Sequence, residues 1–598
     1  MLIIGILTFI SSIVTAGSPN QSQDVPTICL EEGACFKGTW YESTNDSGTR
    51  FASFQGIRYV LSMYFNIDTN LFQFKTFMNL NYFCLPGLTQ YRYAQPPVDS
   101  LRFRPPLPYK YNEGTYESGA ESNVTCAQQG NEMVIGDEDC LMLNIYVPEK
   151  VFVDDSEKLT VMVWIHGGGL QSGTYVYGRY GPKHFMDKDI VIVSINYRLG
   201  PLGFFSLGNS DVPGNQGLLD QNMAMTWVKK NIENFGGNSN KITIFGESAG
   251  ALSVALHLTS PMSQGLFQRA ILQSGTALAP LWGPVTPQNA LKYAEMSYKL
   301  LGCEQDAENT RDDILECIQG KNVSDIMELS KLSTNLIWMP VPDNEFTDNP
   351  FLPGDAEQLL ELGQFNKDVE IIIGTNADEG LLFMFNAILD PSVWTNFREN
   401  FDIFGPMQLF NIADPNEVTP KDVENAHRIV EEYLGSVDNI DENHIPGITD
   451  MYTDAGFLYG TFKTINWIVN WNVKVYQYIL KFQGNFSYSE LFGIPPMGVS
   501  HADDLIYLWD PVFNIGELPL SEEEMSVREI MTTAWSNFAK NGDPYYGYWK
   551  PVITDNIWNG LWDISSSSPS MELPNDLLDR LRIWYNIMGN STFELRSK

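Results

Sequence analysis

Ser248 stands at the centre of the segment GESAG (residues 246–250), directly between a predicted strand and a predicted helix. Residues 241–245 are mostly β-branched or apolar, which is typical of a strand, whereas residues 251–258 read as the start of a helix. The glycines on both sides of the serine leave room for a sharp turn that lifts the hydroxyl clear of the sheet edge. This succession constrains the chain to an α/β arrangement with a nucleophile at the carboxyl end of a strand.

A run of three glycines follows a second predicted strand. Residues 161–165 are apolar and lead, after one histidine, into the glycine run 167–169. Consecutive glycines let backbone N–H groups converge on one point without obstruction by Cβ atoms, which is what an oxyanion hole needs. We expect the N–H groups of Gly168, Gly169 and Ala249 to form that hole. An ordinary glycine-rich turn is the alternative, and the position after a strand favours the oxyanion hole.

Two further residues complete a catalytic pattern. Residues 369–373 predict another strand, and Glu379 follows it in a polar loop where a carboxylate could orient an imidazole. Taken alone, Glu379 would be an ordinary solvated loop acid. His501 lies downstream of both Ser248 and Glu379, and serine, acid, histidine is the chain order of α/β-hydrolases. The three residues are therefore predicted to act together.

These motifs resemble the type-B carboxylesterase and cholinesterase family, and the sequence around His501 is most similar to that of insect carboxylesterases. The resemblance runs over roughly residues 33 to 560, and further matching stretches occur at 138–145, 196–200, 214–221 and 535–544. It implies an α/β-hydrolase fold, with a central, mostly parallel sheet flanked by helices and the site at the carboxyl ends of the strands. Residues from Asp422 to Gly435 are expected to form one of the helices that cover the site.

The resemblance implies a serine carboxylesterase that uses neither a cofactor nor a metal. Ser248 would be the nucleophile, His501 the general base and then the acid, and Glu379 the group that orients the imidazole. Glu247 and Ser274 match positions close to these three residues. With an ordinary histidine, activity should rise near pH 6–7 as His501 loses its proton.

The expected substrate is a small-molecule ester with apolar groups, of xenobiotic, dietary or lipidic origin. The loop between Cys126 and Cys140 contains no aromatic residue on which a choline group could stack, which disfavours acetylcholine. Juvenile hormone esterases usually carry glutamine at the position of Glu247, so that specialisation is also disfavoured. Either Leu281 or Trp282, depending on a one-residue shift, would line the acyl pocket.

Two other functions are open to such a chain. One is a slow-turnover protein that sequesters esters or organophosphates. The other is a non-catalytic adhesion-type relative, although such proteins typically lose one of the three catalytic residues. The formal net charge of −36 excludes nucleic acid as a partner.

Several features predict a secreted, extracellular protein. Residues 1–17 resemble a signal peptide, no later stretch is long enough for a membrane anchor, and residues 18–598 are expected to form a single carboxylesterase domain, as a monomer or a non-covalent oligomer. The family resemblance implies the disulfides Cys126–Cys140 and Cys303–Cys317, and Cys29–Cys35 is a third candidate. Candidate glycosylation sites are Asn45, Asn123, Asn322, Asn485 and Asn590.

Residues 60–93 form an anomalous insertion in the family pattern. The segment is crowded with Phe, Asn, Tyr, Leu and Met, residues that AT-rich codons encode, and it contains the odd cysteine, Cys84. We interpret it as a retained intron translated in frame. The alternative is a genuine exposed loop, whose phenylalanines would then form an apolar patch.

Overall fold

The computed structural model describes residues 26–30, 33–43, 50–54, 57–59, 92–112, 114–118, 124–130, 133–153, 157–304, 310–332, 337–545, 548–553, 560–571 and 575–588. The predicted signal peptide, residues 60–91 of the anomalous insertion and the candidate sequons at Asn45, Asn123 and Asn590 lie outside these residues. The predictions made for them therefore stay predictions.

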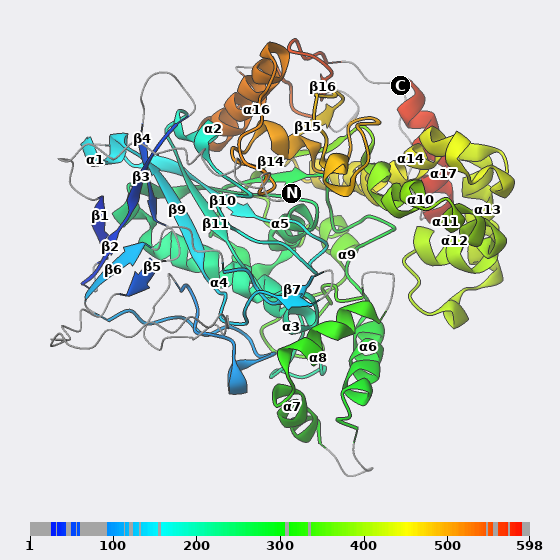
Figure 1. Ribbon diagram of the computed structural model, residues 1–598, viewed down its shortest axis with the longest axis horizontal. Coiled ribbons are helices and arrows are strands. Elements are labelled where there is room, and N and C mark those ends of the chain that lie inside the picture. The colour runs from blue at the N-terminus through cyan, green and yellow to red at the C-terminus, as the bar shows by residue number, and fades with distance from the viewer. Residues whose placement is uncertain are drawn as a thin grey trace, which may run out of the picture.

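A twisted ten-stranded sheet runs through the described part of the molecule (Figure 1). Its strands, in spatial order, are β16 (Leu561–Ile564), β15 (Val475–Leu480), β14 (Glu370–Asn376), β13 (Arg269–Gln273), β12 (Gly237–Glu247), β10 (Leu159–Ile165), β11 (Ile190–Ile195), β9 (Leu143–Pro148), β4 (Arg50–Phe54) and β3 (Thr39–Glu42). All pairs from β16 to β11 are parallel, and the pairs from β11 through β9 and β4 to β3 are antiparallel. The predicted α/β-hydrolase fold is thus confirmed.

Both faces of this sheet are covered, which explains why its strands are apolar without alternation. All seven residues of β10 are buried. Its odd-numbered side chains pack into one apolar cluster with α4 (Gln216–Asn231) and α5 (Ala249–Thr259). Met162 and Trp164 pack into a second cluster with α16 (Glu522–Asn541) on the other face.

A group of helices from the last part of the chain lies at one end of the molecule, coloured from yellow-green to red in Figure 1. It consists of α10 (Phe385–Leu389), α11 (Ser392–Glu399), α12 (Phe401–Leu409), α13 (Pro420–Leu434), α14 (Ile445–Thr453), α15 (Tyr459–Val469) and α17 (Asn575–Met588). The helix expected near Asp422 is α13, which Thr419 caps together with Asp422 and which ends at Gly435 with φ of 75°. Local capping signals therefore fixed both of its ends.

The remaining strands and helices frame the rest of the fold. They are β1 (Thr27–Cys29), β2 (Ala34–Lys37), β5 (Ile57–Tyr59) and β6 (Gly114–Ser118), which form a small separate sheet, β7 (Gln128–Gln129), β8 (Val134–Ile135), α1 (Lys150–Val153), α2 (Lys183–Met186), α3 (Gly200–Phe204), α6 (Pro287–Leu300), α7 (Arg311–Gln319), α8 (Val323–Met327) and α9 (Ala356–Glu361).

Three disulfides join cysteines that are near in sequence. They are Cys29–Cys35, Cys126–Cys140 and Cys303–Cys317, the three pairs considered from the sequence. Among the helices that the structure describes, none has the length and apolar character needed to cross a membrane.

Candidate active site

Ser248 occupies the turn between β12 and α5 in a strained backbone conformation, with φ of 59° and ψ of −125°. Its N–H donates to the Gln273 carbonyl at 2.8 Å, which ties the turn to β13. A Cβ on Gly246 or Gly250 would lie only 2.6 Å or 2.1 Å from the Ile165 carbonyl oxygen. Both glycines are therefore required, because helix and strand approach so closely that the serine is forced out of the sheet.

The predicted oxyanion loop lies directly against this turn. A Cβ on Gly167 would be 3.0 Å from the Ser248 Cβ, and a Cβ on Gly168 would be 2.1 Å from the Ser172 carbonyl oxygen. Gly168 and Gly169 both have positive φ, at 109° and 63°. Within the described residues, neither of their N–H groups donates to a protein acceptor. The two donors are free to bind a ligand oxygen beside Ser248, as the sequence predicts.

Glu379 and His501 are brought together from loops that follow β14 and β15. The Nδ1 atom of His501 lies 2.6 Å from Glu379 Oε2. Glu379 is fully buried, and its other oxygen accepts the Asn376 N–H at 2.7 Å. This carboxylate has no freedom to turn away, so the imidazole carries its proton on Nδ1 and presents Nε2 to the cavity.

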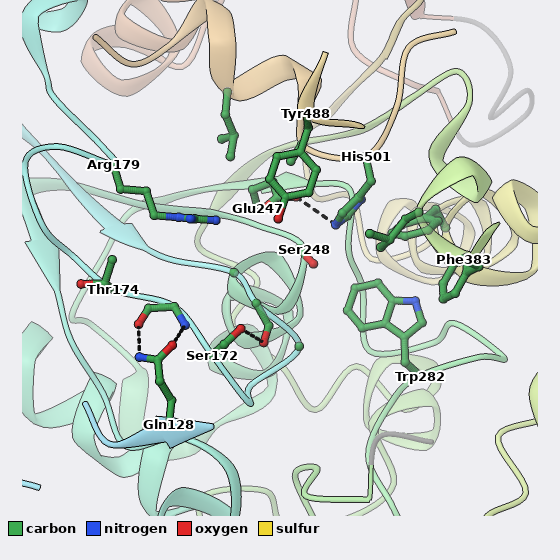
Figure 2. A pocket seen from close by; sticks show the side chains of 18 of the residues that line it. Gln128, Ser172, Thr174, Arg179, Glu247, Ser248, Trp282, Phe383, Tyr488 and His501 are labelled. Atoms are coloured by element: carbon green, nitrogen blue, oxygen red, sulfur yellow. Dashed lines mark hydrogen bonds and ion pairs between the residues drawn. The ribbon is translucent and has the colours of Figure 1, made fainter. Parts of the chain in front are cut away.

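The second ring nitrogen of His501 also lies beside a carboxylate. His501 Nε2 lies 3.0 Å from Glu247 Oε1, the dashed contact in Figure 2. Among the described residues no hydrogen bond joins His501 to Ser248. Catalytic hydrogen bonds are often long in a free enzyme and tighten when substrate binds. In this structure the nearest group to Nε2 is therefore Glu247 rather than Ser248.

The carboxylates around His501 change the pKa expected for its imidazole. Burial alone lowers the pKa of His501, but the neighbouring carboxylates of Glu247, Glu379 and Asp504 raise it more, so the pKa lies above its ordinary value. Burial also raises the pKa of Glu247. The rise in activity expected near pH 6–7 from the sequence should therefore occur at higher pH, because three carboxylates stabilise the imidazolium.

Ser248 lines a cavity of about 620 Å³ whose two sides differ in polarity (Figure 2). On one side lie the aromatic side chains of Trp282 and Phe383, with Phe457 packed against both, and their sequence neighbours Leu281 and Leu382 also line the cavity. On the other side lie polar side chains: Gln128, Ser172, Thr174 and Arg179. We call them the apolar wall and the polar wall.

The sequence left Leu281 and Trp282 as alternatives for one wall position, and both line the cavity. Trp282 is fixed by a hydrogen bond from its indole N–H to the Gly456 carbonyl at 2.7 Å and by the Phe457 ring. Ser274 is buried at the end of β13, where its N–H donates to the Gly374 carbonyl at 2.8 Å. It is not a lining residue of the cavity.

Sequence reasoning missed all four residues of the polar wall. Arg179 lies in a stretch without a recognisable motif, and only the return of that loop to the cavity reveals it. Tyr488 and Phe457 were missed for the same reason, since they come from distant segments. The described residues contain no group of three or more His, Cys, Asp or Glu side chains positioned to hold a metal ion.

Two candidate glycosylation sites fall within the described residues. Asn322 and Asn485 are both exposed. The Asn485 side chain donates to Glu524 at 2.8 Å, whereas the Asn322 amide has only a 3.5 Å contact with Asp325. Asn322 is thus the more accessible of the two.

Comparison with known proteins gives a consistent result. A family model described as the carboxylesterase family matches residues 89–570. Juvenile hormone esterase of Tribolium castaneum is 34% identical over 479 residues, which cover 76% of this chain and 79% of that protein. Pyrethroid hydrolase Ces2a of Mus musculus is 35% identical over 471 residues, covering 76% and 78%.

A solved structure has the same fold. Juvenile hormone esterase from Manduca sexta, with OTFP covalently attached, matches with a TM-score of 0.78 at 24% identity, covering 94% of this chain and 100% of that chain.

Proposed function

This chain belongs to the carboxylesterase family and is a carboxylic ester hydrolase, and we propose that Ser248, His501 and Glu379 carry out the hydrolysis of apolar esters through an acyl-enzyme. The observation that carries the proposal is the buried 2.6 Å contact between His501 and Glu379, beside a serine in a strained turn. A group fixed in this way serves as a base for an adjacent hydroxyl.

The first half of the reaction forms an ester on the enzyme. As His501 Nε2 takes the proton of Ser248, Oγ attacks the substrate carbonyl, whose oxygen becomes negatively charged. The free N–H groups of Gly168 and Gly169, with that of Ala249 at the start of α5, donate to this oxygen. His501 then gives its proton to the departing alcohol, and the acyl group stays on Ser248.

The second half repeats the chemistry with water. His501 removes a proton from water, which attacks the acyl-enzyme, and the oxyanion is again held by the glycine loop. When the tetrahedral intermediate collapses, the carboxylic acid leaves and Ser248 recovers its proton from His501. Glu379 orients the ring and stabilises the imidazolium that forms twice per turnover.

The apolar wall supports esters with an apolar acyl group. Trp282, Phe383 and Phe457 offer a largely preformed aromatic surface beside Ser248, and a cavity of about 620 Å³ is within the usual range for drug-sized ligands. We therefore assign Leu281 and Trp282 to the acyl pocket. Glu247 in place of glutamine, as noted from the sequence, argues against a juvenile hormone esterase.

We also propose that the protein acts outside the cell. Its three disulfides support this location, because such bonds form and persist in oxidising compartments. Exposed Asn322 supports it as an accessible sequon. Secretion by a cell line and a mass shift removed by a peptide N-glycosidase would test it, and retention inside the cell would contradict it.

Steady-state hydrolysis of 1-naphthyl acetate tests the mechanism. The wild-type chain should turn over repeatedly, and Ser248→Ala should be inactive while keeping its melting temperature. Ser526→Ala, on the exposed face of α16, is the matched control. A single burst without turnover would instead indicate the sequestering protein, since acylation would then outrun deacylation.

A further inference from the structure

Arg179 is a charged residue of the cavity that the proposed ester hydrolysis does not use. The residue lies in the loop between the glycine run and α2, and its side chain lines the cavity. Figure 2 shows the guanidinium pointing toward Tyr488 and Ser248, on the side of the serine opposite Trp282 and Phe383. A positive charge therefore faces the place where substrate binds.

Aromatic residues hold this guanidinium without neutralising it. Its Nε donates to the Tyr180 hydroxyl at 3.3 Å, and the Tyr488 phenol is close enough to interact with it electrostatically. The group also lies 5.8 Å from the ring centroids of both Tyr180 and Phe513. The two phenols use at most about two of the five N–H donors of an arginine, so donors remain for a ligand.

Several other arginines with little solvent exposure in this protein have carboxylate partners. Arg102 pairs with Glu138, Arg198 with Asp220 and Arg580 with Asp454. In the described part of the chain, no carboxylate lies within ion-pair distance of Arg179. Charges withdrawn from water are normally paired. Arg398 and Arg528 are also partly buried without an ion-pair partner among the described residues, but of these three arginines only Arg179 lines the cavity.

Two neighbouring groups bear on the charge in this region. Glu247 is close enough to interact electrostatically with Arg179, but its Oε1 is already 3.0 Å from His501. Thr174, also on the polar wall, is only 7% exposed, and its Oγ1 has no hydrogen-bond partner among the described residues. The wall thus offers an unpaired cation and an unused hydroxyl.

We propose that Arg179 is the centre of an anion subsite, so that the preferred substrates are esters carrying a carboxylate on the side opposite their apolar group. This inference rests on the proposed function, because it places the anion relative to Ser248. A planar guanidinium binds a carboxylate with two parallel, charge-assisted hydrogen bonds. The subsite would therefore select among esters that the apolar wall alone would treat alike.

The carboxylate could belong to either half of the ester, and two matched substrate pairs distinguish the halves. In the first pair the alcohol carries it: para-(butanoyloxy)benzoate is compared with para-(butanoyloxy)benzamide. In the second pair the acyl group carries it: the mono-1-naphthyl ester of adipic acid is compared with 1-naphthyl hexanoate. For each pair we measure the ratio of kcat/KM for the anionic ester to kcat/KM for the neutral one, which cancels effects on Ser248.

The test compares the wild type with Arg179→Gln, Arg179→Lys and a control. We expect Arg179→Gln to lower the ratio in at least one pair by roughly 10-fold to 100-fold, as for loss of a hydrogen bond to a charged group, and Arg179→Lys to lower it less. Arg428→Gln makes the same charge change on the exposed face of α13 and should leave both ratios unaltered. Unaltered ratios in Arg179→Gln, with the neutral esters still hydrolysed, would overturn the subsite but not the esterase.

A binding measurement tests, without catalysis, whether Arg179 binds a carboxylate. Calorimetric titration of Ser248→Ala with para-hydroxybenzoate and with adipate should show binding that Arg179→Gln weakens by a similar factor. If the wild type hydrolyses no ester, the proposed function fails, and this titration still tests the subsite. Equal affinity in Ser248→Ala and in the double variant would refute it.

Discussion

The two walls of the cavity differ in where their residues come from and in how they are held. Trp282 and Phe457 on the apolar wall are packed against each other, and a backbone carbonyl fixes the indole. On the polar wall Gln128 holds the loop by exchanging hydrogen bonds with Gly173, at 2.8 Å and 2.9 Å, but Arg179 and Thr174 keep unused donors. Trp282 and Phe457 are therefore held in place without a ligand, whereas the polar wall keeps hydrogen-bond donors that a ligand can use.

This difference separates affinity from selectivity. Burial against the apolar wall stabilises any substrate of suitable size, at about 25 cal/mol per Å² of apolar surface. The polar wall discriminates, because a donor left without an acceptor costs more than a missing apolar contact. Ser248 lies between the walls. The predictions below therefore begin with substitutions that should affect every substrate and end with those that should affect only one property.

The largest effect is expected at Ser248, where both walls meet. Ser248→Ala should lower kcat by roughly 10⁴-fold or more, because a catalytic unit loses nearly all of its effect with its nucleophile. The loss should be equal for neutral and anionic esters. Steady-state assays with both substrate types check this, and residual turnover that differs between them would mean that another group near Arg179 contributes to the chemistry.

The oxyanion loop comes next, since it also serves both walls. Gly168→Ala places a Cβ 2.1 Å from the Ser172 carbonyl oxygen at a positive φ, so the loop must shift. We expect a fall in kcat of roughly 100-fold or more, the usual result of losing one oxyanion donor.

Gly265→Ala is the matched control for this change. Gly265 also has positive φ, at 80°, but no atom lies within 4 Å of a Cβ there. It should lose some stability and no activity. Comparable kcat losses in the two variants, at equal melting temperatures, would remove the oxyanion role from the glycine run.

Widening the apolar wall should change acyl preference alone. Trp282→Ala removes the indole that contacts Phe457, and we expect kcat/KM for 1-naphthyl benzoate relative to 1-naphthyl acetate to rise by about 10-fold. Trp471→Ala, which removes a partly exposed indole outside the cavity, is the control. An unchanged ratio would place the acyl group elsewhere.

The smallest effect is expected at Glu247, in the pH dependence of kcat/KM. The base acts when His501 is neutral, and Glu247 stabilises its charged form, so Glu247→Gln should lower the pKa of His501. The rising limb of kcat/KM against pH should therefore move to lower pH by about one unit or more.

Glu361→Gln, an exposed carboxylate on α9, gives the same charge change far from the imidazole. Its pH profile should match that of the wild type. A limb that stays in place in Glu247→Gln, or moves to higher pH, would show that Glu247 is uncharged when the enzyme acts.

Most of the catalytic elements were predictable because their signals are local. The strand expected at 241–245 forms the end of β12, the helix expected from 251 is α5, and the strands expected at 161–165 and 369–373 are β10 and β14. Glycines at 246 and 250 predicted the turn, because only glycine fits so close to a neighbouring carbonyl. The adjacency of Cys29 and Cys35 in paired strands required the structure.

The sequence by itself predicted the strand–turn–helix around Ser248 and the glycine loop, since these depend on a few neighbours along the chain, and the family resemblance predicted the fold and the proposed catalytic residues. Only the tertiary structure decided the contact between Glu247 and His501, the resulting rise in the pKa of that imidazole, and the position of Arg179 opposite Trp282. These features arise where segments distant in sequence meet in a cavity. Charge and burial act through space there, so no local pattern records them.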